Sequence, residues 1–271
     1  LKPLKLVHTA WIGGVAGGWL MATQKPRRSG RRHGQTLVVG LTGSIGMGKS
    51  TASTWFKELG VALNDADAVV HRLYGAGGEA VAPVRGLFGD EVIGEDGGVS
   101  RPLLSKHVVG EANAANLKRL EAIVFPLVDA DRDKFIDNAT RNGQGLAVLD
   151  IPLLFERGLE QFCDIVLVVS APSACQRSRV LARPGMTAEK FEAILGKQVP
   201  DAEKRTKADR VLDTGVPLEE TRAAVVAFVD ECRQQVANEQ RFRKLAAVSV
   251  ALGISFGGLL LWRALRRRSA E

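Results

Sequence analysis

One glycine-rich segment constrains the fold of this chain more than any other feature. It matches the pattern G-x-x-x-x-G-K-[ST] and reads Gly43, Ser44, Ile45, Gly46, Met47, Gly48, Lys49 and Ser50, followed by Thr51. An apolar run at 37–41 precedes it, and a helix-like run at 51–59 follows it. A strand, a glycine loop and a helix N-terminus in that order form an anion cradle, because backbone N–H groups and the helix dipole face the phosphate oxygens. We therefore predict a nucleotide-binding loop rather than a chance glycine-rich turn.

The end of this motif carries specific chemistry. We expect the Lys49 ammonium to reach the β- and γ-phosphates of ATP, and the Ser50 hydroxyl to bind Mg²⁺. ATP and Mg²⁺ are thus the predicted cofactors. A phosphate loop alone fits kinases, motors, GTPases and transporters. The chain has no Asn-Lys-x-Asp motif for reading guanine, and its body is small for a ring ATPase, so a small kinase is favoured.

The body of the chain alternates strand-like and helix-like segments. Continuous apolar runs at 146–150 and 165–169 are typical of strands buried on both faces of a parallel sheet. Shorter strands are expected at 61–63 and 210–212, and helices at 172–182 and 218–236. Residues 75–140 hold no strong strand and are a predicted helical insertion, with a helix at 112–138 that Pro126 either bends or starts anew. The predicted fold class is α/β, with a three-layer α/β/α core around a parallel sheet.

Charge divides the 271-residue chain into three parts. Residues 1–36 carry seven Lys or Arg and no acid, and residues 241–271 carry seven Lys or Arg and one acid. Because the whole chain has a net charge of +7, residues 37–240 are net acidic. An acidic body disfavours nucleic acid as a partner. The predicted domains are a basic tail at 1–36, a catalytic domain at 37–240 and a basic C-terminal segment at 241–271.

The C-terminal segment contains a long uncharged run. The 18 residues from Leu245 to Trp262 carry no charge, and basic residues flank both ends. At a rise of about 1.5 Å per residue this run spans about 27 Å, close to the hydrocarbon core of a bilayer. Gly253 and Gly257 would let two such helices approach closely. We predict a transmembrane helix at 245–262; the alternatives are a buried core helix and an amphipathic surface helix.

Two further features concern location. The run from Val7 to Ala22 is apolar and glycine-rich and is followed by five basic residues, so it is either a second span or the remnant of an organellar targeting segment. The three cysteines, at 163, 175 and 232, form no C-x-x-C pair. This scatter favours a reducing compartment.

Two aspartates follow the second predicted strand. Ligands of a doubly wound sheet bind outside the carboxyl ends of its strands, so we expect Asp65 and Asp67 beside the phosphate cradle. A carboxylate there can accept a hydroxyl proton and share Mg²⁺. Asp65 is equally well explained as the cap of the following helix. Asp67 is the predicted catalytic base and, with Ser50, a predicted metal ligand.

A basic segment downstream is a candidate lid. Arg179 and Arg183 are four residues apart, which predicts that they share one helix face. The loop after them can close over ATP and bring guanidinium groups to the transferring phosphate. The alternative is a solvated basic helix face.

Five motifs in order between residues 37 and 235 resemble those of the dephospho-CoA kinase family. They are the phosphate loop with its flanks at 41–51, the D-A-D at 65–67, the P-L-L-F-E at 152–156, Gln176 with Arg179 and Arg183, and the stretch from Gln198 to Gly215. The resemblance implies a P-loop kinase core with a helical substrate domain and a lid. It also implies transfer of the γ-phosphate of ATP to the ribose 3′-hydroxyl of dephospho-CoA.

The same resemblance implies roles for individual residues. Asp67 is the implied base, and Lys49 and Arg183 are implied to act in catalysis. ATP is implied to bind to the segment from Gly43 to Thr51 and to Arg179 and Arg183. The implied contacts to dephospho-CoA come from a larger set, namely Asp65, Asp67, Pro152, Leu153, Leu154 and Glu156.

The chain departs from the family pattern in three places. Phe125 stands where the family usually has His before Pro-Leu, and Thr214 stands where it usually has Asn. The hydrophobic tail is not part of the compact bacterial form, which favours a membrane-tethered eukaryotic version in a mitochondrial or plastid membrane. Two other functions stay open at this point: another P-loop kinase of small molecules or nucleotides, and a catalytically silent, membrane-bound scaffold that binds nucleotide.

Overall fold

The computed structural model describes residues 36–268, with the side chains of 36–110 and 112–245. Its centre is a parallel five-stranded sheet in the order β2-β3-β1-β4-β5. The strands are β1 Leu37–Thr42, β2 Ala62–Asp65, β3 Leu146–Asp150, β4 Ile165–Ser170 and β5 Arg210–Asp213. The parallel sheet predicted from the sequence is confirmed.

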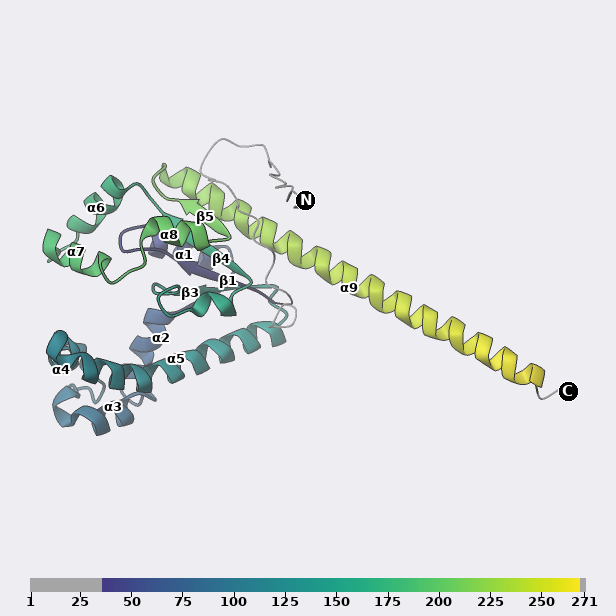
Figure 1. Ribbon diagram of the computed structural model, residues 1–271, viewed down its shortest axis with the longest axis horizontal. Helices are drawn as coiled ribbons and strands as arrows, with labels where there is room; N and C mark the ends of the chain where they lie inside the picture. Colours follow the sequence, from purple (N-terminus) through teal and green to yellow (C-terminus); the bar gives the residue numbers. More distant parts are fainter. Residues whose placement is uncertain (1–35, 269–271) are drawn as a thin grey trace, which may run out of the picture.

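Helices cover both faces of this sheet (Figure 1). On one face, α1 Lys49–Glu58 and the first part of α9 Leu218–Arg268 pack on β1, and Phe56 meets Phe228 edge to face with ring centroids 6.2 Å apart. On the other face, α5 Ala114–Arg141 contributes to a second core around Val38, as does Ala208, directly after α8 Asp201–Lys207. Alternate residues of β1 therefore point into two different cores, which explains its unbroken apolar sequence.

The insertion between β2 and β3 has a small core of its own. Its helices are α2 Ala66–Tyr74, α3 Val81–Phe88, α4 Arg101–Val108 and α5, with 3₁₀ turns η1 Asp90–Val92 and η2 Glu111–Asn113. Buried Val69, Val84 and Leu104 belong to this third core. Helix α5 continues through Pro126, which excludes the start of a new helix, one of the two predicted alternatives. The insertion lies to one side of the sheet (Figure 1).

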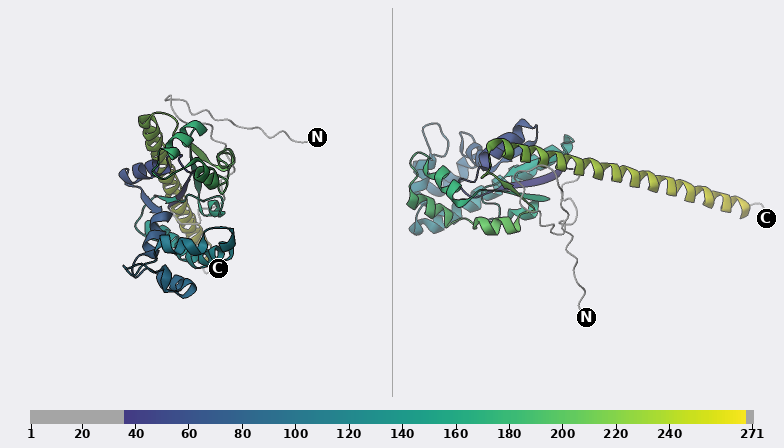
Figure 2. Two further views of the ribbon diagram at one scale, coloured as in Figure 1. Left: turned by 90° about the vertical axis from the view of Figure 1, so that its left-hand side faces the viewer. Right: turned by 90° about the horizontal axis from the view of Figure 1, so that it is seen from above.

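The segment between β4 and β5 is also helical. It contains α6 Ser173–Leu181, α7 Ala188–Leu195 and α8, while a 3₁₀ turn, η3 Leu159–Phe162, precedes β4. Helices α6 and α7 lie beside the sheet at the carboxyl ends of its strands (Figures 1 and 2).

The last helix extends well past the body. We predicted its end at 236, but α9 continues to Arg268 and projects away from the sheet (Figures 1 and 2). Within the part of the chain that the structure describes, no helix is long and apolar enough to cross a membrane. The predicted span at 245–262, apart from Leu245, lies outside the residues with described side chains. The run from Val7 to Ala22 also lies outside the described residues.

Candidate active site

The glycine-rich segment forms a loop between β1 and α1, which is the local structure expected from the sequence. Gly46 and Gly48 have φ angles of 79° and 87°, a backbone conformation that residues with a side chain rarely adopt. A Cβ atom at Gly46 would lie 2.4 Å from a methyl carbon of Val180. No side chain of the described residues caps the start of α1. The first N–H groups of this helix are therefore available to an anion.

Lys49 forms an ion pair with Asp150 at the carboxyl edge of the sheet. Asp150 ends β3, is 2% exposed and also accepts a hydrogen bond from Ser53 Oγ on α1. The sequence analysis did not predict this link between Asp150 and the lysine. The sheet order makes the link, since β3 lies next to β1. An aspartate at the end of a buried strand is the sequence signal that points to such a partner.

Asp65 and Asp67 lie at the carboxyl end of β2 and differ in their surroundings. Asp65 Oδ1 accepts hydrogen bonds from the backbone N–H of Asp67 at 3.0 Å and of Ala68 at 3.2 Å. This geometry favours the capping role for Asp65. Asp67 is exposed, and its carboxylate has no hydrogen-bond or ion-pair partner among the described residues. It is therefore free to meet a ligand.

The two candidate lid arginines lie in different settings. Arg179, on α6, donates to Thr214 O at 2.6 Å, and Thr214 Oγ1 in turn donates to Met47 O in the phosphate loop at 2.8 Å. Arg183 lies beyond α6, which ends at Leu181, so the shared helix face that we predicted does not form. The Arg183 side chain is exposed on the connection to α7. Thr214, at the position of the usual Asn, thus links α6 to the loop.

Two glutamines hold the phosphate loop from outside. Gln176 Nε2 on α6 donates to Ile45 O at 2.8 Å, and Gln198 Oε1, after α7, accepts from Ile45 N at 3.1 Å. Both backbone polar groups of Ile45 are thereby engaged. The sequence marked these glutamines only as members of motifs. Their role depends on how the segment between β4 and β5 folds back, which no local pattern encodes.

The segment at 152–156 follows β3 and turns its side chains in different directions. Pro152 O accepts a hydrogen bond from Thr42 Oγ1 at 3.1 Å, and Leu153 is 41% exposed. Leu154 is fully buried in the second core. Glu156 Oε1 accepts from Val199 N at 2.8 Å and lies 2.9 Å from Lys204 Nζ. Of the residues assigned to dephospho-CoA, Leu154 and Glu156 therefore face protein, whereas Leu153 faces outward.

Phe125 on α5 stacks against Arg157, which directly follows this segment. The guanidinium carbon of Arg157 lies 3.8 Å from the centroid of the Phe125 ring. Asp129 Oδ1 lies 3.6 Å from Arg157 Nη2 and also pairs with Arg132 at 2.8 Å. Burial lowers the pKa of Arg157 from its usual value. Phe125, at the position where the family pattern usually has His, thus stacks on a half-buried cation.

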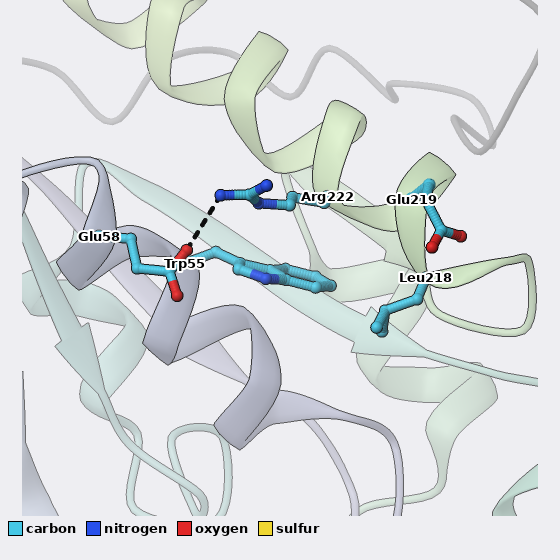
Figure 3. A pocket seen from close by; sticks show the side chains of 5 residues that line it. All are labelled: Trp55, Glu58, Leu218, Glu219 and Arg222. Carbon is cyan, nitrogen blue, oxygen red and sulfur yellow. Dashed lines mark hydrogen bonds and ion pairs between the residues drawn. The ribbon is translucent and has the colours of Figure 1, made fainter.

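A surface hollow of about 360 Å³ lies between α1 and the start of α9 (Figure 3). Its lining residues are Trp55, Glu58, Leu218, Glu219 and Arg222. Arg222 Nη2 pairs with Glu58 Oε2 at 3.1 Å across it. None of these lining residues belongs to the phosphate loop, so this hollow is not the nucleotide site.

The sequence is similar to known proteins over most of its length. Residues 37–219 match a family model described as Dephospho-CoA kinase. A dephospho-CoA kinase of Mesorhizobium japonicum is 54% identical over 199 residues, which cover 73% of this chain and 98% of that protein. A dephospho-CoA kinase of Novosphingobium aromaticivorans is 50% identical, covering 73% and 96% of the two chains.

Solved structures share the fold. TT1252 from Thermus thermophilus superposes with a TM-score of 0.61 at 34% identity, covering 72% of this chain and 97% of that one. A dephospho-CoA kinase from Campylobacter jejuni gives a TM-score of 0.54 at 21% identity, covering 73% and 98% of the two chains. The second likeness supports the fold alone. Residues 1–36 and 220–271 lie outside the family match.

Proposed function

Because the chain belongs to the dephospho-CoA kinase family, we propose that the site at the carboxyl edge of its sheet carries out that family's reaction with Asp67 as the base. The chain transfers the γ-phosphate of ATP to the ribose 3′-hydroxyl of dephospho-CoA, the final step of coenzyme A biosynthesis. The observation that carries the assignment of the base is the exposed Asp67 carboxylate, which no described residue binds.

On the donor side, the segment from Gly43 to Thr51 holds ATP. Its backbone N–H groups and the uncapped start of α1 bind phosphate oxygens. The ion pair with Asp150 holds Lys49 beside the loop. Phosphate oxygens then draw the ammonium towards the transferring group, where it neutralises the charge that develops in the transition state.

On the acceptor side, the oxygen of the ribose 3′-hydroxyl attacks the γ-phosphorus and ADP leaves. Asp67 takes the proton of that hydroxyl during the attack. Asp65 supports this step without touching the reacting atoms. Its two hydrogen bonds fix the first turn of α2, from which Asp67 projects. A cap of this kind contributes about 1 kcal/mol to the helix.

The donor set fits Mg²⁺. Magnesium takes hard oxygen ligands together with substrate phosphates, and the site offers the exposed Ser50 hydroxyl and the free Asp67 carboxylate. We assign Ser50 and Asp67 to hold the ion. When bound, it neutralises negative charge on the phosphates.

The lid and the wall complete the site in this proposal. Arg183 is exposed on the connection between α6 and α7, so it is free to reach the transferring phosphate. Arg179 binds ATP, and its hydrogen bonds to Thr214 hold it beside the phosphate loop. Pro152 and Leu153 shape the acceptor wall, whereas Leu154 and Glu156 hold that wall from behind.

We also propose that residues 245–262 tether the kinase to a membrane. Two observations support this: α9 runs on without a break from the body into this segment, and Phe242 and Leu245, just before it and at its start, are 75% and 67% exposed. The two relatives described above are bacterial and lend no support to a eukaryotic origin or to a mitochondrial or plastid location. The tether is therefore proposed without naming the membrane.

The test of the activity is ADP formation by the purified full chain with Mg²⁺ and ATP. Dephospho-CoA is compared with AMP, CMP and pantothenate as acceptors, and Asp67→Asn is the matched control. We expect turnover with dephospho-CoA alone. Turnover with a different acceptor, or equal turnover by Asp67→Asn, would overturn the proposal for substrate or base respectively.

A further inference from the structure

The stretch from Gln198 to Lys204, between α7 and the end of α8, touches three separate parts of the site. We call it the crosspiece. It contacts the phosphate loop through Gln198, the end of β4 through Asp201, and the acceptor wall through Val199 and Lys204. The donor and acceptor sides of the reaction are thus joined by one short segment of chain.

The contact on the donor side is with Ile45. Gln198 Oε1 accepts the Ile45 N–H at 3.1 Å, and Gln176 Nε2 binds the Ile45 carbonyl at 2.8 Å. The next residue is Gly46, with φ of 79°, where the phosphate-binding turn begins. A shift of the Ile45 peptide therefore reorients the N–H groups that meet the phosphates.

The contact on the acceptor side is a buried ion pair. Lys204 is 0% exposed, and its Nζ lies 2.9 Å from Glu156 Oε1, which also accepts Val199 N at 2.8 Å. Opposite charges attract strongly in a poorly polarisable interior, and a buried charge that loses its partner is costly. Movement of the crosspiece away from Glu156 would therefore leave buried charges unpaired and cost free energy. We expect the crosspiece and Glu156 to move together.

The middle of the crosspiece is fixed to the sheet. Ser170 Oγ, at the end of β4 and 3% exposed, donates to Asp201 Oδ2 at 2.7 Å. This bond lies between the two end contacts in the sequence. Ser170 therefore anchors the segment to β4 between its contact with Ile45 and its contact with Glu156.

We propose that Gln198, Glu156 and Lys204 are positioning residues that couple the acceptor wall to the phosphate loop. This coupling rests on the proposed function, in which the loop binds ATP and the wall faces dephospho-CoA. Nucleotide affinity then depends on the Glu156–Lys204 pair, although neither residue belongs to the loop. By linkage, dephospho-CoA changes the affinity for nucleotide and nucleotide changes the affinity for dephospho-CoA by the same factor.

The experiment is a double-mutant cycle on the full chain, read out by equilibrium binding of Mg²⁺ and the β,γ-imido analogue of ATP without acceptor. One arm is Gln198→Ala, the other is the charge-free pair Glu156→Gln with Lys204→Met, and the third variant combines them. We expect each arm to weaken binding by about three- to tenfold, the size of one net hydrogen bond. The combined variant should bind the ATP analogue no more weakly than whichever arm binds it more weakly. Lys197→Ala, an exposed neighbour, is the control and should bind as the wild type does.

Thermal melting of the same proteins separates positioning from simple damage. We expect the losses in melting temperature of the two arms to add, while their losses in nucleotide affinity do not. Multiplicative affinity losses in the combined variant, or wild-type affinity in the charge-free pair, would overturn the coupling.

A second measurement keeps the proposal testable if the charge-free pair does not fold. Dephospho-CoA should shift the affinity of the wild type for the ATP analogue, and Gln198→Ala should abolish that shift. A shift of full size in Gln198→Ala would overturn the coupling. Failure of the proposed function has a different signature, because the chain would then bind nucleotide and show non-additive variants yet form no ADP with dephospho-CoA.

Discussion

Lys49 and Asp150 meet as an ion pair although 101 residues separate them. Asp150 ends β3, Lys49 begins α1, and the parallel alignment of β3 with β1 brings them together. The side chain of Lys49 is 15% exposed and that of Asp150 is 3% exposed. Asp150 therefore holds the Lys49 ammonium beside the loop, and in the proposed mechanism the phosphate oxygens of ATP compete with Asp150 for it.

Lys49→Ala tests the donor side of the site. We expect weaker ATP binding and a fall in turnover on the order of 10²–10³, because the variant removes a charge that stabilises the transition state. Turnover and ATP affinity are measured together. Lys57→Ala is the matched control, since Lys57 is an exposed lysine on the same helix. Equal losses in both variants would show a general charge effect instead.

Asp67→Asn tests the base. The amide cannot take the hydroxyl proton, so turnover should fall on the order of 10²–10⁴, while ATP binding stays nearly intact. Asp65→Asn is the companion variant, because Asn caps a helix about as well as Asp, and it should keep near-wild-type turnover. If Asp65→Asn lost as much turnover as Asp67→Asn, Asp65 would share in the chemistry rather than cap α2.

The core of this site was predictable from the sequence, and the parts that hold it in place were not. The phosphate loop and the aspartates at 65 and 67 directly follow or end strands that apolar runs in the sequence predict. The partners of Lys49 and Ile45 come from segments more than 100 residues away. Their contacts depend on strand order and on how the segment between β4 and β5 folds back, and neither leaves a local pattern.

Helix continuity was left open at Pro126 and was wrong at residue 236, in each case for a physical reason. Pro126 breaks the hydrogen-bond pattern of a helix, yet α5 continues through it because the helix packs on both the insertion core and the sheet core. The sequence predicted a helix that ends at 236, and in the structure Val236 is the last residue of α9 in the described core. Beyond it no Gly or Pro interrupts the chain before Gly253, so the helix runs on.

Phe125→His restores the residue usual in the family and makes stability depend on pH. A neutral His keeps much of the stacking on Arg157, but a protonated His repels the guanidinium 3.8 Å from the ring that it replaces. The unfolded chain takes up that proton near pH 6.5, so the folded state, which resists protonation, loses stability as the pH falls below this value. From pH 8 to pH 5 the melting temperature of Phe125→His should fall more than that of the wild type. Parallel curves would show that Arg157 does not sense this position.

Cys232 should resist alkylation in the folded protein. It is 1% exposed, and burial raises the pKa of its thiol to about 12. At pH 8 only about one thiol in 10⁴ would be the reactive thiolate. Iodoacetamide followed by peptide mass spectrometry should therefore label the half-buried Cys175 first and Cys232 only after denaturant is added. Rapid labelling of Cys232 under native conditions would show that α9 opens from the sheet.

Removal of residues 241–271 tests the membrane tether. The cut leaves the core whole, because Val236 is the last residue of the described core, so the truncated protein should fold and keep its kinase activity. It should move from the membrane pellet to the soluble fraction, since burial of an 18-residue apolar run is the main force that holds such an anchor. Removal of 263–271 alone is the control; it deletes four basic residues but keeps the run, and should leave most protein in the pellet. A truncated protein that still pellets with membranes would place the attachment elsewhere, with the apolar run from Val7 to Ala22 as the next segment to delete.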